Sequence, residues 1–103
     1  MQPLTSKQRA HLRKLAHRLK PVVIIGNDGV TDAVVRAVAD ALNTRELLKV
    51  KALETAPGSI REAADALAAA IPGAQVAQTI GRTAVLYRPD PEKPEIVLPR
   101  ASG

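Results

Sequence analysis

The order in which apolar patterns change along the chain is the feature that most restricts what it can fold into. Short apolar runs typical of β-strands alternate with longer segments of helical periodicity, and glycine or proline residues separate them. From the N-terminus the order is helix, strand, helix, strand, helix, strand, strand. With 103 residues the chain has room for one domain. We therefore expect one sheet with helices packed against it.

Three segments have the signals of amphipathic helices, and each opens on a residue that caps helix N-termini. These residues are Thr5, Thr31 and Ser59. Gln8 and Glu62 lie three positions after the first and the third cap, which is the spacing of a capping box. We expect the first helix to span residues 5–19 and the second to end near Asn43. The apolar spacing of the first helix predicts a buried stripe of Leu12, Leu15, Ala16 and Leu19.

Four segments have the composition of strands. They are residues 22–25, 46–52, 76–80 and 84–88. The first is apolar without alternation, which predicts a strand buried on both faces. The second alternates, so its apolar face is expected in the core while Lys49 and Lys51 face solvent. Gly81 and Arg82 separate the last two strands, and a two-residue turn with glycine first suits a type II′ hairpin.

These elements predict an α/β fold of the α+β kind, with a mixed four-stranded sheet and three helices. The two strand–helix–strand connections favour parallel neighbours, whereas the final hairpin is antiparallel. We expect a single domain over residues 1–99. Within it, residues 89–99 form an extended proline-rich segment whose apolar residues 96–98 are able to dock on the body. Residues 100–103 are expected to be a flexible C-terminus.

The net charge of +5 is concentrated near the N-terminus. Residues 1–20 contain six lysine and arginine residues and no acid. On a helix, Lys7, His11, Lys14 and Arg18 fall on one side, apart from the apolar stripe. Such segregation suits an anionic partner, although a solvated basic face explains it equally well.

The composition excludes several kinds of site. The chain has no cysteine, so it has no disulfide or thiolate metal site, and its two histidines lack neighbouring acids. We expect no metal, no cofactor and no enzymatic activity, because no nucleophile or carboxylate pair is evident. Tyr87 is the only aromatic residue, which argues against nucleic-acid binders that stack several bases. A strand tyrosine is more often part of the core.

The longest apolar run has four residues, far below the roughly 20 that span a bilayer, and no secretory signal is evident. The acid-free N-terminus is like that of a transit peptide, but its apolar residues are needed for the core. We expect a cytoplasmic monomer with no membrane contact and no small-molecule substrate.

The loop Gly26-Asn27-Asp28-Gly29 joins a strand to a helix N-terminus. Free backbone N–H groups and the helix dipole favour anions there, and glycine lets a phosphate approach the backbone. The alternative is an ordinary turn, since these residue types are common turn formers. Asp28 counts against phosphate contact because its carboxylate repels a phosphodiester. The Lys and Ser/Thr of a P-loop are absent, so nucleotide hydrolysis is not expected.

Five blocks of sequence occur in register with a known family. They are LTSKQR (residues 4–9), KPVV (20–23), GNDGVT (26–31), ELLKVK (46–51) and IGRTAVLYRP (80–89). Together they resemble the CRM domain (chloroplast RNA splicing and ribosome maturation) in its stand-alone bacterial YhbY-type form. The resemblance covers about residues 4–99. It implies a KH-like fold similar to the C-terminal domain of translation initiation factor three, and binding to RNA of large-ribosomal-subunit precursors.

The resemblance also implies a role for the G-x-x-G loop, because the family's loop is compared with the one that clamps the nucleotide backbone in KH domains. Where this chain has Asp28, the family more often has asparagine. The candidate RNA-contacting residues are therefore Gly26, Asn27, Asp28, Gly29, Lys7, Lys14, Arg18, Lys20, Lys49, Lys51 and Arg82. Arg82 is expected as an exposed cation at the hairpin tip. A different function remains open, in which the basic face docks an acidic protein.

Overall fold

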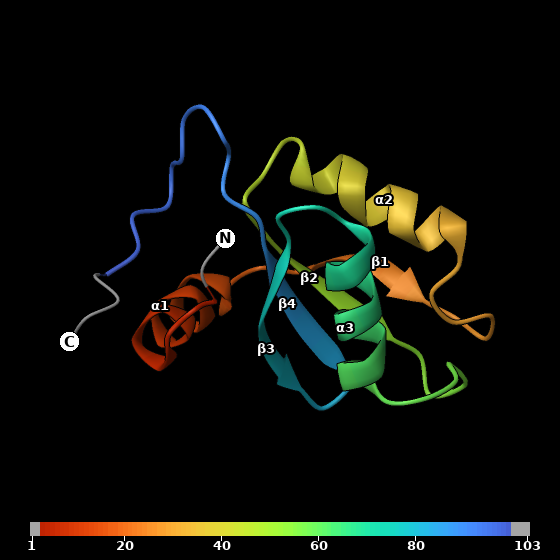
Figure 1. Cartoon of the computed structure of the whole chain (residues 1–103). Coiled ribbons are helices and arrows are strands. Elements are labelled where there is room, and N and C mark those ends of the chain that lie inside the picture. Colours follow the sequence, from red (N-terminus) through yellow and green to blue (C-terminus); the bar gives the residue numbers. More distant parts are fainter. Residues whose placement is uncertain (1–2, 100–103) are drawn as a thin grey trace.

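The computed structural model describes residues 3–99, and its helices and strands follow the order expected from the sequence (Figure 1). Residues 100–103, expected to be flexible, lie outside the described part. The elements are α1 (Ser6–Ala16), β1 (Pro21–Ile25), α2 (Asp32–Leu42), β2 (Leu47–Ala52), α3 (Ile60–Ala70), β3 (Gln75–Ile80) and β4 (Thr83–Tyr87).

The four strands form one mixed sheet in the order β1-β2-β4-β3. β1 and β2 are parallel, as the first crossover predicted, and β4 is antiparallel to both of its neighbours. The second crossover does not join neighbours, because β4 lies between β2 and β3. Gly81 has φ +56° and Arg82 does not have positive φ, which fits a type II′ turn after Ile80.

Helices cover both faces of the sheet (Figure 1). On one face α2 and α3 pack over a core that includes Ile25, Val50 and Leu67. On the other face α1 packs against β3, β2 and β4, and the core there includes Leu12 and Tyr87. Each face of the sheet thus has its own hydrophobic core. In the described residues α1 is the only helix on its face, whereas α2 and α3 share the other.

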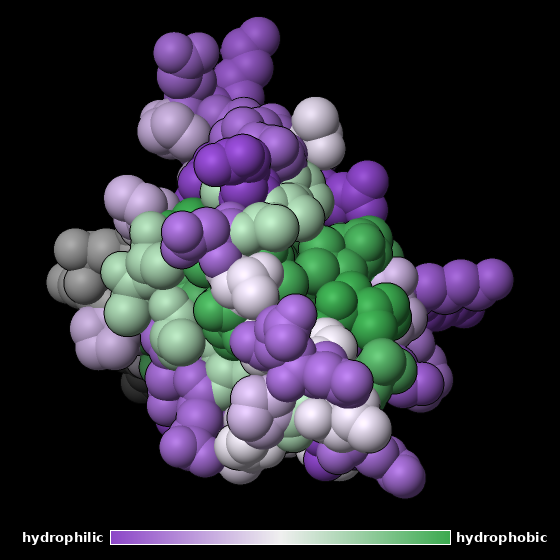
Figure 2. Space-filling model, turned by 90° about the vertical axis from the view of Figure 1, so that its right-hand side faces the viewer, coloured by the Kyte–Doolittle hydropathy of each residue, from purple (hydrophilic) through white to green (hydrophobic). Residues whose placement is uncertain are grey.

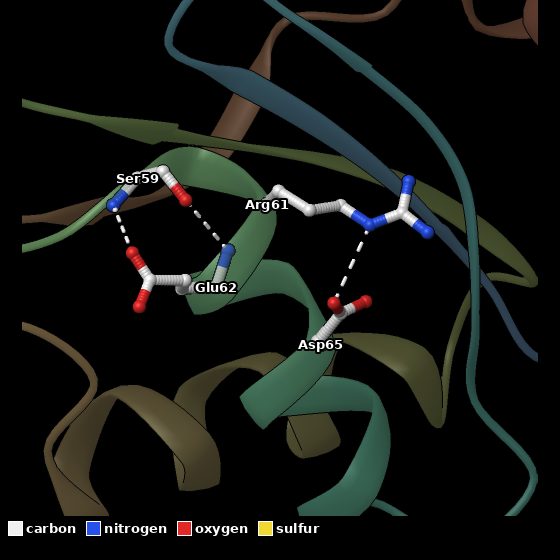
Figure 3. A network of polar contacts seen from close by, with 4 residues as sticks. All are labelled: Ser59, Arg61, Glu62 and Asp65. Atoms are coloured by element: carbon white, nitrogen blue, oxygen red, sulfur yellow. Dashed lines mark hydrogen bonds and ion pairs between the residues drawn. The ribbon is translucent and has the colours of Figure 1, made fainter.

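Both expected capping boxes are present. The Gln8 N–H donates to Thr5 Oγ1 and the Thr5 N–H donates to Gln8 Oε1, each at 3.1 Å. The pair Ser59 and Glu62 repeats this arrangement at the start of α3 (Figure 3). The bonds from Ser59 hold the pKa of the Glu62 carboxyl below its ordinary value.

Two expectations about burial are wrong. α1 ends at Ala16 and not near Leu19, so Leu15 (43% exposed) and Leu19 (37% exposed) are not part of a buried stripe. In β1, Val22 is 40% and Ile24 is 50% exposed, although burial on both faces was expected. The reason is the topology: β1 is an edge strand, and α1 packs on the other three strands.

Glu46 is a structural residue that the sequence reasoning missed. Its side chain is buried (8% exposed) and ties the C-terminal segment, residues 88–99, to the body. The backbone N–H groups of Asp90, Glu95 and Ile96 donate to its two carboxylate oxygens at 2.6–2.8 Å. Beyond this anchor, Ile96 and Leu98 pack on the α1-side core.

Asp90 holds the first turn of this segment, and this makes the turn sensitive to acid. Its Oδ1 accepts the N–H groups of Glu92 (2.8 Å) and Lys93 (3.1 Å), which lower the pKa of the carboxyl from its ordinary value of 3.8. A depressed pKa means that the stabilisation is present above pH 3.8 and is lost as pH falls through the folded-state pKa. We expect the Glu92 and Lys93 amides to lose their protection from exchange in that acid range, relative to an unstructured peptide at the same pH. Hydrogen-exchange NMR measures these protection factors, and an Asp90→Ala variant should show low protection of both amides at every pH. High protection in that variant would contradict the assignment.

Candidate nucleic-acid interface

Three chain segments meet at the end of the sheet where β1 and β2 finish. The loop Gly26–Gly29 follows β1, and the Leu53 N–H beside it donates to the Ile25 carbonyl at 2.9 Å. The Ala52 N–H donates to the Arg82 carbonyl at 2.8 Å, which brings the β3–β4 hairpin tip to the same place. We call this the loop end of the sheet.

The G-x-x-G loop is an ordered turn that leads directly into α2. The Gly29 N–H donates to the Gly26 carbonyl at 3.0 Å, and Thr31 Oγ1 accepts the Val34 N–H at 3.2 Å as the helix cap. The side chains of Asn27 and Asp28 are exposed at its tip. The loop thus lies at a helix N-terminus, as expected, and presents one amide and one carboxylate to solvent.

The fold requires glycine at position 29 of the loop but not at position 26. Gly29 has φ +72°, and a Cβ there would lie 3.0 Å from Pro57 Cγ, so backbone conformation and packing both require it. Gly26 lacks positive φ, and a Cβ there would meet nothing within 4 Å. The fold therefore does not explain Gly26, whose open side is free for a ligand to approach.

This difference gives a stability prediction. We expect Gly29→Ala to lower the free energy of unfolding by about 1–2 kcal/mol, because it adds backbone strain and a clash. Gly26→Ala is the matched control and should change it by less than about 0.5 kcal/mol. Urea denaturation of the two variants measures the contrast, and equal effects would contradict it.

The candidate cations do not all lie together. Lys14 and Arg18 are exposed at the end of α1, around a hollow that also includes Ile80 of the β3–β4 hairpin. Lys49 is half-buried and Lys51 exposed, both on the α1 side of β2. The structure therefore groups these four cations on the α1 side of the sheet, toward its loop end. We call this group the α1-side cations.

Two candidate lysines lie outside this group. Lys7 is on the first turn of α1, which begins beside the start of β3, since the Leu4 N–H donates to Gln75 Oε1 at 3.1 Å. It is therefore at the opposite end of the sheet. Lys20 is exposed immediately before β1. Because α1 ends at Ala16, Arg18 also lies beyond the helix, and the expected helical row of cations is shorter than predicted.

The expectation that Arg82 is an exposed cation is wrong. Its side chain is half-buried, its Nε donates to the Ala52 carbonyl at 3.1 Å, and one terminal nitrogen donates to the Leu53 carbonyl. The two acceptors are the backbone carbonyls of the last residue of β2 and of the residue after it. Arg82 thus holds the loop end of the sheet together. Two of the three nitrogen atoms of its guanidinium already donate to these carbonyls.

The α1-side cations form no ion pair with an acidic residue in the part of the chain that the structure describes. Within residues 3–99 the one ion pair joins Arg61 and Asp65, at 3.3 Å on the exposed side of α3 (Figure 3). No carboxylate of the described residues therefore neutralises Lys14, Arg18, Lys49 or Lys51 at short range. Their charge is available to an anionic ligand.

Apolar side chains accompany these cations at the edge of the sheet. Figure 2 looks at the side where β1 and the start of α2 lie and shows hydrophobic side chains gathered among hydrophilic ones. The exposed apolar residues of β1 and the link after β2 are Val22, Ile24 and Leu53.

Tyr87, the one aromatic residue of the chain, is only 3% exposed. Burial raises the pKa of its hydroxyl, and Glu46 adds to the shift. Tyr87 is a core residue and is not open to a base.

The structure also brings together residues that were not singled out in the sequence. A pocket of about 220 Å³ lies between the end of α1 and the sheet, and Arg13, Gln78 and Thr83 contribute to its lining together with Lys49. The composition of residues 76–80 was a signal that Gln78 is on a strand, whereas Thr83 lies outside the predicted strand 84–88 and belongs to β4. The strand register that places them on the α1 side could not be inferred from it.

Neither a cluster of metal-ligand side chains nor a membrane-spanning helix is found among the described residues. In residues 3–99 no three His, Asp or Glu side chains are grouped as metal ligands would be. No helix of that range is long and apolar enough to cross a bilayer.

The chain is similar to proteins of one family along most of its length. The model of the "CRS1 / YhbY (CRM) domain" family matches residues 4–88. The chain is 41% identical to the "Probable RNA-binding protein YqeI" of Bacillus subtilis, over 93% of this chain and 99% of that protein. It is 44% identical to an "RNA-binding protein" of Haemophilus influenzae, over 97% of this chain and 99% of that protein.

A solved structure shares the fold. The solution structure of the Staphylococcus aureus hypothetical protein SAV1595 aligns with a TM-score of 0.79 and 38% identity, covering 93% of this chain and 99% of that one. The α/β fold described above is therefore shared with that protein.

Proposed function

Because this chain belongs to the CRS1/YhbY (CRM) domain family, we propose that it is a non-enzymatic RNA-binding protein that associates with precursor RNA of the large ribosomal subunit in the cytoplasm and assists its assembly. It holds RNA by the backbone, through the α1-side cations and the G-x-x-G loop. The relatives named as RNA-binding proteins support the RNA part of this proposal.

The single observation that carries the proposal is the set of unpaired cations on one side of the sheet. Phosphate contacts by Lys and Arg supply most of the affinity of proteins that hold nucleic acid without reading its sequence. Lys49 and Lys51 are two positions apart on one strand, about 7 Å. Together with Lys14 and Arg18 they form a surface that can follow an RNA backbone.

We expect the G-x-x-G loop to contribute to RNA affinity in its own right. Gly26→Ala and Asp28→Asn should then change that affinity in opposite directions. A methyl group at Gly26 keeps the fold but holds a phosphate away from the backbone, so affinity for RNA should fall about threefold to tenfold. Removing the charge of Asp28 should raise affinity about twofold to fivefold, because like charges at close range repel. Fluorescence anisotropy with a labelled RNA stem-loop measures both. Unchanged affinity in both variants, with unchanged melting temperature, would remove the loop from the interface.

The partner is tested in cells by crosslinking the protein to RNA and sequencing the recovered fragments. We expect enrichment of large-subunit ribosomal RNA that still carries precursor ends. Sedimentation adds a second measurement, in which the protein should leave the ribosomal fraction after nuclease treatment. Recovery of unrelated RNA, with no precursor ends, would refute the ribosomal assignment and leave general RNA binding in place.

One observation favours a second function, a module that docks an acidic protein. The exposed Val22 and Ile24 beside Lys51 combine apolar and basic character, as a protein-binding surface does. In that case the protein should leave the ribosomal fraction after protease digestion of its partners and stay after nuclease treatment. The opposite pattern is expected for RNA binding.

A further inference from the structure

The pocket between α1 and the sheet is placed to receive a ligand together with the α1-side cations. Gln78, Val85 and Lys49 are neighbours across three strands, since Val85 pairs with both Gln78 and Lys49. Thr83, Arg13 and His17 complete its polar lining. The pocket therefore opens on the same side of the sheet as Lys14, Arg18 and Lys51.

The lining combines an apolar floor with polar groups that lack partners. Ala16 (1% exposed) and Val85 (4% exposed) are buried core residues at its base. Among the described residues, the Gln78 amide and the Thr83 hydroxyl make no side-chain hydrogen bond, and Lys49 and Arg13 make no ion pair. A donor–acceptor amide, a hydroxyl, the His17 imidazole and two cations thus converge on an apolar surface that nothing in the described chain occupies.

A nucleobase fits these features better than a bare phosphate does. A nucleobase is flat, has an apolar face and carries donors and acceptors on its edge, and amide side chains pair well with such edges. A phosphate alone would leave the apolar floor and the amide acceptor unused. The volume of about 220 Å³ is below the roughly 300–1,000 Å³ typical of drug-sized ligands, which favours a fragment of the size of one base.

We propose that this pocket holds one unstacked base of the bound RNA, with Gln78 and Thr83 bonding its edge and Arg13 and Lys49 contacting the adjacent phosphates. The inference rests on the proposed RNA binding and deepens it. It provides base contact without Tyr87, which is buried, because the base is inserted between a helix and a sheet. It follows that unpaired RNA is preferred over a duplex, whose bases are stacked and paired.

The test compares wild-type protein with the double variant Gln78→Leu and Thr83→Val, which removes the polar atoms and keeps the side-chain volume. The probes are labelled oligo(A), oligo(C) and oligo(U) of about a dozen nucleotides and an RNA duplex of the same length. We expect the wild type to prefer one homopolymer over the others and over the duplex. The double variant should lose about tenfold in affinity for that homopolymer, lose the base preference, and keep its duplex affinity within about twofold. Thr79→Val is the matched control, since Thr79 pairs with Ala84 of the opposite-side core and does not line this pocket.

A second measurement uses wild-type protein alone and so does not depend on the folding of a variant. The preferred oligonucleotide is made with one 2-aminopurine, whose fluorescence is quenched by base stacking. We expect its fluorescence to change on binding when the probe base enters the pocket, and unchanged fluorescence at every probe position would contradict the base pocket.

The outcomes separate the pocket from RNA binding itself. Equal affinity for all homopolymers and the duplex, unaltered in the double variant, would overturn the base pocket and leave RNA binding intact. Failure of the wild type to bind any of these RNAs would overturn both. Mononucleotides that bind as tightly as the oligonucleotides would assign the pocket to free nucleotides. Loss of the double variant from the ribosomal fraction with all RNA affinities retained would assign it to a protein contact.

Discussion

Replacing Glu46 with alanine is expected to lower the melting temperature by about 10–20 °C. The carboxylate of Glu46 is buried and accepts three backbone N–H groups from residues 90–96. Hydrogen bonds to a charged group stabilise more than neutral ones, and losing this anchor should cost about 2–3 kcal/mol. Ile96 and Leu98 are then expected to leave the α1-side core, which adds to the loss.

The matched control is Glu95→Ala. It removes a glutamate side chain from the C-terminal segment but keeps the backbone N–H of residue 95, which donates to the Glu46 carboxylate. Its melting temperature should stay within a few degrees of the wild type. Calorimetry measures both variants, and hydrogen exchange of the Asp90, Glu95 and Ile96 amides reports the release of the segment. Equal melting temperatures for Glu46→Ala and Glu95→Ala would show that the anchor does not stabilise the fold.

Local features of the fold could be predicted because local sequence determines them. A capping box needs residues three positions apart, and both boxes are present as expected. The turn at Gly81 depends on one glycine between two apolar runs. The same holds for the order of helices and strands, since hydrophobic periodicity depends on neighbours within a few residues.

Features that depend on distant segments could not be predicted. The apolar run of β1 suggested burial on both faces, but burial depends on which strands α1 covers. Glu46 had no sign of burial in its sequence context, because its three donors come from more than 40 residues away. The insertion of β4 between β2 and β3 is likewise set by strand pairing and not by the order of elements.

The candidate site shows the same division. Its residue types were predicted, and the structure gathers four of the seven cations on one side. Lys7 could not be separated from Lys14 by sequence, since both are basic residues of one helix. The bonding of Arg82 to the Ala52 and Leu53 carbonyls joins segments about 30 residues apart, so its structural role was not visible either.

The position of the α1-side cations predicts the effect of reversing two of them. Lys14→Glu combined with Arg18→Glu is expected to weaken RNA binding by more than about tenfold, because two phosphate contacts become repulsive. The fold should remain intact, since both side chains are exposed and make no hydrogen bond or ion pair within the described residues. Anisotropy titrations measure the affinity, and circular dichroism checks the fold.

The control must separate position from net charge. Arg45→Glu combined with Lys93→Glu also lowers the net charge by 4, from +5 to +1. Both residues are exposed and lie at the end of the sheet opposite the loop end. We expect this variant to keep affinity within about threefold. Salt adds an independent readout, because each lost phosphate contact reduces the slope of log affinity against log salt by about 0.9. The α1-side reversal should reduce the slope by about 2 and the control reversal by much less. Equal losses of affinity and slope in the two variants would mean that net charge, and not this surface, holds the RNA.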